Sequence, residues 1–115
     1  MRLLIVEDNA LMRGLIRSLV SDLAVIVDEC SSGEEAVARY AETRPDCVLM
    51  DYEMGAMDGL TATAAIIAAH PAARIVLVTQ YSDRYLREAA RAAGVCGFVG
   101  KENLSAVREV IDRMM

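Results

Sequence analysis

The sequence has few aromatic residues, lacks a long apolar run and lacks the features of a secretory signal. Its 115 residues contain no tryptophan, one phenylalanine, one histidine and two prolines. No apolar run approaches the roughly 18 to 20 residues that a membrane-spanning helix needs, and the first residues carry neither the basic segment nor the cleavage site of a secretory signal. These shortages predict a cytoplasmic protein without a membrane segment.

Positive charge and cysteine are also scarce. The 12 basic and 17 acidic residues give a formal net charge of −5, which argues against binding to nucleic acid or to anionic membranes. All but one of the basic residues are arginine, and the exception is Lys101. A lysine kept among arginines indicates a role for a compact ammonium group on a flexible stem. Cys30, Cys47 and Cys96 are odd in number and lack metal-ligand spacing, so we expect free, buried thiols in a reducing compartment.

Apolar residues are abundant, at 55% of the chain, and they occur in short runs separated by helical patterns. Runs of four apolar residues are typical of strands that are buried on both faces, as in a parallel sheet covered by helices. We predict strands at about residues 2–7, 24–29, 47–50, 74–79 and 96–99. The second should be an edge strand, in which Val25 and Val27 alternate with other residues. Five strand–helix units with short connections predict one α/β domain over residues 1–115 with a parallel five-stranded sheet.

Apolar spacing and capping residues place the helices between these strands. The first helix has leucines at four-residue spacing and further apolar residues beside them, namely Leu11, Leu15 and Leu19 with Met12, Ile16 and Val20. Ser32 and Glu35 form a capping box that opens the second helix. The third should run from about Gly59 to His70 and include Leu60, Ala64, Ile66 and Ile67. We expect Ser82 to cap the fourth helix and Gly94 to end it, with Leu86, Ala89, Ala90 and Ala93 facing inward.

Polar side chains follow four of the predicted strands at the point where each strand ends. Glu7 and Asp8 follow the first strand, Asp51 the third, Thr79 ends the fourth, and Lys101 follows the fifth. The carboxyl ends of parallel strands converge on one edge of a sheet, where ligands bind. Three acids, a hydroxyl and an ammonium should therefore meet in one crevice.

These residues and their surroundings carry a resemblance to a known family. The matching segments are 6–9 (Val-Glu-Asp-Asn), 50–54 (Met-Asp-Tyr-Glu-Met), 57–59 (Met-Asp-Gly), 78–79 (Val-Thr) and 97–101 (Gly-Phe-Val-Gly-Lys). Over essentially its full length the chain resembles the receiver domain of two-component response regulators. The resemblance implies a flavodoxin-like (βα)5 three-layer sandwich with strand order 2-1-3-4-5, Mg²⁺ as cofactor, and phosphorylation of an aspartate by a histidine kinase or a phosphotransfer protein.

The chemistry of the residues supports the roles that the resemblance implies. Clustered carboxylates repel one another, and a hard divalent ion with oxygen ligands relieves that repulsion. By the family pattern, Mg²⁺ binds Asp8, Asp51 and the main-chain carbonyl of Glu53 directly, and Glu7 through water. Asp51 is then the phosphoryl acceptor, and Mg²⁺, Lys101 and the Thr79 hydroxyl each take one oxygen of the phosphoryl group.

The family pattern also assigns a switch to the last strand. Phe98 lies three residues before Lys101, where the family keeps an aromatic residue that changes rotamer on activation. Turning inward, it would change the face formed by the fourth and fifth helices and the fifth strand, and so control a partner or an output domain. The resemblance leaves homodimerisation on phosphorylation open. Glu102 stands where many receivers have proline, a feature common in receivers of LuxR-type regulators.

Three residues should border the approach to Asp51. Glu53 and Tyr81 each lie two residues beyond a site residue, and Gln80 directly follows Thr79. Tyr81 can shield a phosphoryl group from water, whereas Glu53 can orient a water molecule toward it. Their balance should set how long the phosphorylated form persists.

Three other functions are alternatives to a phosphorylated switch. A haloacid-dehalogenase-like phosphatase also uses an Asp nucleophile, Mg²⁺ and Lys, but the acid pair on the first strand and the short chain disfavour it. A flavodoxin-like cofactor binder would need a hydroxyl- and glycine-rich loop where residues 7–9 read Glu-Asp-Asn. A receiver that folds but acts only as an unphosphorylated interaction module is the third.

Overall fold

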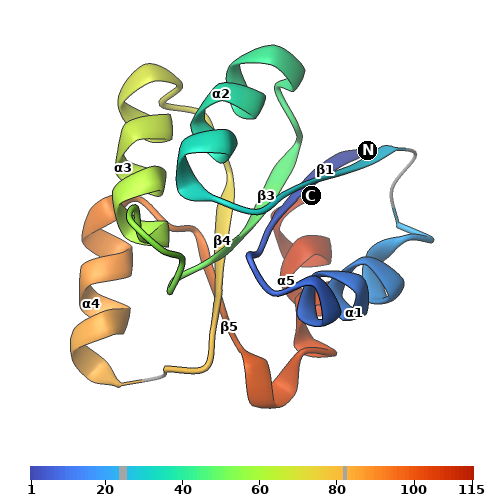
Figure 1. Ribbon diagram of the computed structural model, residues 1–115. Coiled ribbons are helices and arrows are strands. Elements are labelled where there is room, and N and C mark those ends of the chain that lie inside the picture. The colour runs from blue at the N-terminus through green and yellow to red at the C-terminus, as the bar shows by residue number, and fades with distance from the viewer. Residues whose placement is uncertain (24–25, 82) are drawn as a thin grey trace.

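Five parallel strands form one sheet with helices on both faces (Figure 1). The computed structural model describes residues 1–23, 26–81 and 83–115. Strands and helices alternate along the chain as β1 (Arg2–Val6), α1 (Ala10–Val20), β2 (Ile26–Cys30), α2 (Gly33–Thr43), β3 (Cys47–Asp51), α3 (Gly59–Ala69), β4 (Ile75–Thr79), α4 (Arg84–Ala93), β5 (Gly97–Gly100), the 3₁₀ turn Lys101–Asn103 and α5 (Ala106–Met114). The strand order β2-β1-β3-β4-β5 confirms the predicted flavodoxin-like α/β fold.

The sheet separates two hydrophobic cores. Leu4, Met50 and Leu77 pack on one face with residues of α2, α3 and α4, and these three helices lie together on one side of the sheet in Figure 1. Leu3 and Leu49, their chain neighbours, pack on the other face with residues of α1 and α5. Every residue of β3 and β4 is buried. The continuous apolar runs are therefore explained by burial on both faces.

The ends of the helices and strands agree less well with the prediction than their order along the chain does. β2 is an edge strand, as predicted, and its Ile26 is 43% exposed. Val25 and Ser82 lie outside the described residues. Asp83 caps α4, not Ser82 as predicted: its Oδ1 accepts a hydrogen bond from the backbone N–H of Leu86 at 2.8 Å. Serine and aspartate are both good caps, so the pattern alone could not choose between these neighbours.

The predicted apolar pattern of α1 is confirmed only in part, at Met12, Ile16, Leu19 and Val20. Leu11 and Leu15 are 83% and 54% exposed, and the helix buries Ile16 and Val20 against the sheet and α5. Leu11 and Leu15 each precede a core-facing residue by one position, a rotation of roughly 100° around the helix, which turns them toward solvent. In α4 the prediction of an inward position is confirmed for Leu86 and Ala90, which are buried, and is wrong for Ala89, which is exposed.

Two glycines fix the ends of helices. Gly94 ends α4 with a φ of 101°, which confirms the predicted stop, because this left-handed conformation favours glycine. Gly59 opens α3 so close to β3 that a Cβ atom there would lie 2.0 Å from the backbone oxygen of Asp51. Its N–H donates to the Tyr52 carbonyl at 2.7 Å. The start of α3 is thus pressed against the backbone that carries Asp51.

The cysteines are free, as expected, but only two of them are buried. Burial raises the pKa of the Cys30 thiol to about 11 and that of Cys47 to about 12, so both stay protonated and unreactive near neutral pH. Cys96 is exposed, which corrects the prediction for that residue. Among the described residues, no helix has the length and apolar character to cross a bilayer.

Candidate functional site

The strand register brings the predicted polar residues to one edge of the sheet. Val6 of β1 pairs with Met50 of β3, Asp51 with Val78 of β4, and Thr79 with Gly100 of β5. Glu7 follows Val6 and Lys101 follows Gly100, so this register places Glu7, Asp51, Thr79 and Lys101 at the same edge of the sheet. They line a pocket of about 210 Å³ at the carboxyl ends of the strands, and its walls are Glu7, Asp8, Asn9, Asp51, Glu53, Thr79, Gln80, Tyr81 and Lys101. We call it the acidic pocket.

Lys101 joins two buried carboxylates in this pocket. Its Nζ lies 2.8 Å from Oε1 of Glu7 and 3.0 Å from Oδ1 of Asp51. The side chains of Glu7 and Asp51 are only 1% and 4% exposed, whereas that of Lys101 is 17% exposed. An arginine could not place one compact charge between both oxygens in this way, which explains why the single lysine stands here.

The shared lysine gives the two carboxylates opposite pKa shifts. Burial raises the pKa of Asp51 to about 6; the hydrogen bond from Lys101 opposes this shift, and the charge of Glu7 adds to it. Burial also acts to raise the pKa of Glu7, but the bonds from Lys101 and from the Asn9 N–H outweigh it and lower that pKa. Glu7 is therefore the ionised partner, and Asp51 is held near the point where it takes up a proton.

The carboxylates of the pocket fit a hard cation. Glu7, Asp8 and Asp51 each offer an oxygen, and these oxygens lie within 4.8 Å of one another. Both oxygens of Glu7 already have protein partners, since Oε2 accepts from the Asn9 N–H at 3.1 Å. Asp8 is exposed and Asp51 faces the same pocket. An all-oxygen donor set of this charge is the kind that Mg²⁺ takes in proteins.

Thr79 connects the pocket to the loop that follows β4. Its side chain is buried, and its Oγ1 accepts a hydrogen bond from the backbone N–H of Tyr81 at 3.0 Å. Tyr81, Gln80 and Glu53 are exposed and line the pocket, which confirms that they border the approach to Asp51. The Thr79 hydroxyl thus links the buried part of the pocket to the exposed loop residue Tyr81.

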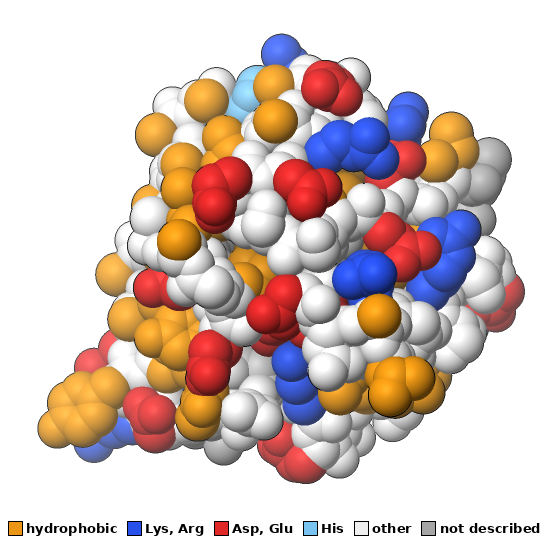
Figure 2. Space-filling model, viewed as in Figure 1, with side chains coloured by type: hydrophobic (Ala, Val, Ile, Leu, Met, Phe, Trp, Pro, Cys, Tyr) orange, Lys and Arg blue, Asp and Glu red, His pale blue; other side chains and the backbone are white. Residues whose placement is uncertain are grey.

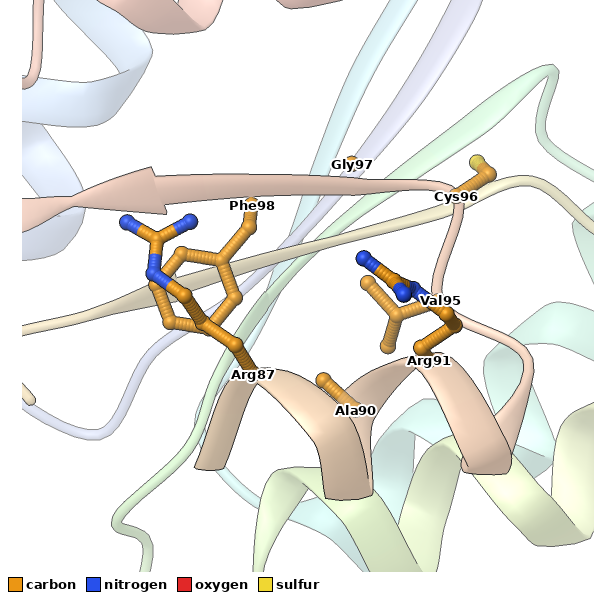
Figure 3. A pocket seen from close by; sticks show the side chains of 7 residues that line it. All are labelled: Arg87, Ala90, Arg91, Val95, Cys96, Gly97 and Phe98. Atoms are coloured by element: carbon orange, nitrogen blue, oxygen red, sulfur yellow. The ribbon is translucent and has the colours of Figure 1, made fainter. Parts of the chain in front are cut away.

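Phe98 lies outside the pocket, on the neighbouring face of β5. It pairs with Leu77 and is half-buried against the core beneath α4. Figure 3 shows Arg87 reaching from α4 across its ring, and the guanidinium carbon lies 4.3 Å from the ring centroid. Beside them is a cavity of about 190 Å³ that Arg91 and Val95 also line. A cation above an aromatic face is attractive, so Arg87 holds the ring in this position.

Sequence reasoning missed two residues that organise Glu7. Asn9 caps α1 through its side chain, which accepts from the Met12 N–H at 2.9 Å, while its own N–H binds Glu7. Arg13 donates from Nη1 to the Glu7 carbonyl at 2.9 Å and pairs with Glu29 of β2 at 3.0 Å. The capping preference of asparagine could have identified Asn9. The long-range contact of Arg13 has no local sequence signal.

The comparisons identify the family. The model of the response regulator receiver domain matches residues 3–112. The chain belongs to this family, whose members are phosphoacceptor switches and not enzymes that turn over a separate substrate. Receiver domains interact with kinases and other signalling proteins.

Individual relatives agree with this assignment. The chemotaxis protein CheY of Listeria monocytogenes is 36% identical over 102 residues, which cover 88% of this chain and 86% of that protein. A LuxR-family response regulator from Aurantimonas sp. SI85-9A1 superposes with a TM-score of 0.92 at 28% identity and covers 98% of this chain and 83% of that one. CheY of Borrelia burgdorferi, solved with CheX, BeF₃ and Mg²⁺, superposes with a TM-score of 0.92 at 25% identity over 98% of this chain and 87% of that one. The likeness thus extends to LuxR-family and CheY receivers alike.

Proposed function

We propose that Asp51 accepts a phosphoryl group from a histidine kinase or a phosphotransfer protein and that this changes how the chain binds a partner or an output domain. The observation that carries the proposal is the position of Asp51. Its side chain is 4% exposed, its carboxylate lies 3.0 Å from the Lys101 ammonium, and its oxygen lies within 4.8 Å of carboxylate oxygens of Glu7 and Asp8. Phosphoryl transfer to an oxygen needs positioning and balanced charge more than covalent chemistry, and this pocket supplies both.

The other site residues predicted from sequence have roles in this proposal as well. Asp8, Asp51 and the main-chain carbonyl of Glu53 would hold Mg²⁺, with Glu7 acting through water. The ion supplies positive charge against the phosphoryl oxygens. Lys101, already within reach of Asp51, binds a second phosphoryl oxygen, and the Thr79 hydroxyl a third.

Phosphorylation then changes the packing near α4. It replaces the single charge of the aspartate with about two charges and adds acceptor oxygens. The Thr79 hydroxyl turns toward them and gives up its bond from the Tyr81 N–H. Phe98 moves inward into the vacated space, and the face of α4, β5 and α5 changes shape for a partner or for a second copy. In this proposal residues 1–115 are one receiver domain that works in the cytoplasm.

One observation favours the alternative of an unphosphorylated interaction module. Lys101 already pairs with both Glu7 and Asp51, so the two buried carboxylates have a cation beside them within the protein itself. Buried ion pairs of this kind can serve a purely structural role.

Labelling decides between the two functions. Incubation with acetyl phosphate and Mg²⁺ should add one phosphoryl mass, mapped to the peptide that contains Asp51. Asp51→Asn should abolish the labelling, whereas Asp112→Asn, at an exposed position of α5, should leave it unchanged. Full labelling of the Asp51→Asn variant would assign the phosphoryl group elsewhere, and an unlabelled wild type would favour the interaction module.

A further inference from the structure

A second concave surface lies between α3 and α4, on the other side of the wall formed by Glu53 and Tyr81. Its volume is about 440 Å³. Three tyrosines and three aliphatic side chains contribute most of its lining, namely Tyr52, Tyr81, Tyr85, Leu60, Leu86 and Ala89. We call it the tyrosine groove. Figure 2 shows hydrophobic side chains gathered over α3 and α4, with Asp and Glu side chains among them.

The aromatic side chains of the groove are accessible to a partner. Tyr85 is 84% exposed and Tyr81 is 40% exposed. The rings of Tyr52 and Tyr81 meet edge to face, with centroids 6.2 Å apart and an interplanar angle of 88°. Because the side chain of Tyr85 stays exposed, it contributes little to the stability of the fold. Exposed aromatic clusters are typical of sites that bind other proteins.

The charge of the groove selects the kind of partner. Glu53 and Asp83 line it, and of the described residues that line it none is basic. The nearby Arg84 is engaged by Glu88 on the helix surface, at 3.3 Å. Tyrosine faces attract cations, and carboxylates at the rim strengthen that attraction. Apolar walls at the same site favour aliphatic side chains beside the cation.

We propose that the tyrosine groove binds a segment of a partner protein in which an arginine is flanked by apolar side chains, and that this segment prefers the unphosphorylated chain. The preference rests on the proposed function. The groove has its present shape while the Tyr81 N–H is bonded to the Thr79 hydroxyl. Movement of that hydroxyl toward a phosphoryl group on Asp51 frees Tyr81, which forms a wall of both the groove and the acidic pocket. By linkage, the bound segment disfavours phosphorylation to the same degree.

Docking is tested on the unmodified chain, without a phosphodonor. The probe is a ten-residue peptide of alternating leucine and arginine, titrated into ¹⁵N-labelled protein. The amide signals of Leu60, Tyr85 and Ala89 should shift, and replacing each arginine of the peptide with neutral citrulline should weaken binding at least five-fold. Shifts confined to other surfaces, equal binding of the citrulline peptide, or a Tyr85-dependent self-association of the chain in place of peptide binding would each overturn the proposal.

Two matched pairs of variants distinguish binding in the groove from a general attraction of the basic peptide to an acidic protein. Tyr85→Ala should weaken binding at least five-fold, while Leu11→Ala, an equally exposed apolar residue on α1, should leave it within two-fold. Glu53→Gln should weaken binding about three-fold, while Glu42→Gln, an exposed position on α2, should not, although both remove one negative charge. Equal effects within either pair would contradict a specific site.

The preference for the unphosphorylated state is tested by repeating the titration with beryllofluoride and Mg²⁺. Affinity for the peptide should fall at least three-fold. An unchanged affinity in a chain that acetyl phosphate does label on Asp51 would overturn the preference and leave the proposed function standing. Failure of the labelling, with peptide binding intact, would instead overturn the proposed function and leave the docking site standing.

Discussion

The two halves of the acidic pocket differ in burial. The carboxylate half, at the ends of β1 and β3, holds Glu7 and Asp51, whose side chains are nearly inaccessible and both contact Lys101. The response half, at the end of β4, consists of the exposed side chains of Gln80 and Tyr81, the latter 40% exposed. Charge is thus fixed in the first half, while the groups that can respond to it lie in the second. Lys101 follows β5 and binds both carboxylates of the first half.

Removing the Lys101 side chain, which contacts both buried carboxylates, should have the largest effect on the free energy of unfolding. Lys101→Ala leaves two buried carboxylates facing each other, and loss of one partner of a buried ion pair costs about 3 kcal/mol. The free energy of unfolding in urea at pH 7 should fall by this amount, and by much less at pH 4, where Asp51 is protonated. A change below about 0.5 kcal/mol at pH 7 would show that the carboxylates do not depend on the lysine.

The stability of the fold should depend on pH because the pKa of Asp51, in the carboxylate half, is raised. The pKa of Asp51 is about 6 in the folded chain, above its ordinary value of 3.8, so the folded state binds the proton more tightly. Stability contributed by this proton is fully present below pH 4 and is lost as the pH rises through 6.

The variant Asp51→Asn tests whether ionisation of Asp51 causes this pH dependence. Without Mg²⁺, Asp51→Asn should stabilise the fold on the order of 2 kcal/mol at pH 7.5 and hardly at all at pH 4, because the amide carries no charge to bury. Urea titrations at the two pH values measure the difference, with Asp112→Asn as the control. An equal gain at both values would contradict a raised pKa at Asp51.

Mg²⁺ should relieve the same repulsion. An ion that binds the assembled acids and not the unfolded chain raises the free energy of unfolding, by about 1 kcal/mol at ~10 mM for millimolar affinity. Asp8→Asn should remove most of this gain while leaving the metal-free fold equally or more stable, since it removes a like charge. Thermal melts with Mg²⁺ and with EDTA provide the measurement. If the wild type melts identically in both, the carboxylate cluster is not a metal site.

The smallest effect should come from the exposed rim of the response half. Tyr81 can shield a phosphoryl group on Asp51, because an attacking water needs a strict line of approach. Tyr81→Ala should speed dephosphorylation several-fold, about 1 kcal/mol in the barrier. Loss of labelled protein after removal of the phosphodonor gives the rate, and Tyr85→Ala is the control outside the acidic pocket. An unchanged or slower rate would mean that Glu53, Gln80 or another group sets the lifetime.

The carboxylate half of the pocket was the easier one to predict from sequence. Glu7, Asp8 and Asp51 end apolar runs whose burial fixes the register, so their convergence follows from the parallel sheet. The contact of Arg87 with Phe98 joins α4 to β5 through side chains that no periodicity links. The exposure of Leu11 and Leu15 was missed for a related reason, since a leucine on a helix does not reveal whether a neighbouring element covers it.

The close approach of Gly59 to the Asp51 backbone leaves no room for a side chain at position 59. Any side chain at position 59 would have to push α3 away from β3, since its Cβ would collide with backbone atoms and not with a flexible side chain. The backbone of Asp51 is therefore packed directly against the first turn of α3. Under the proposed function, substitutions at the exposed rim residues Glu53, Gln80 and Tyr81 would change how long the phosphorylated form lasts without moving Asp51.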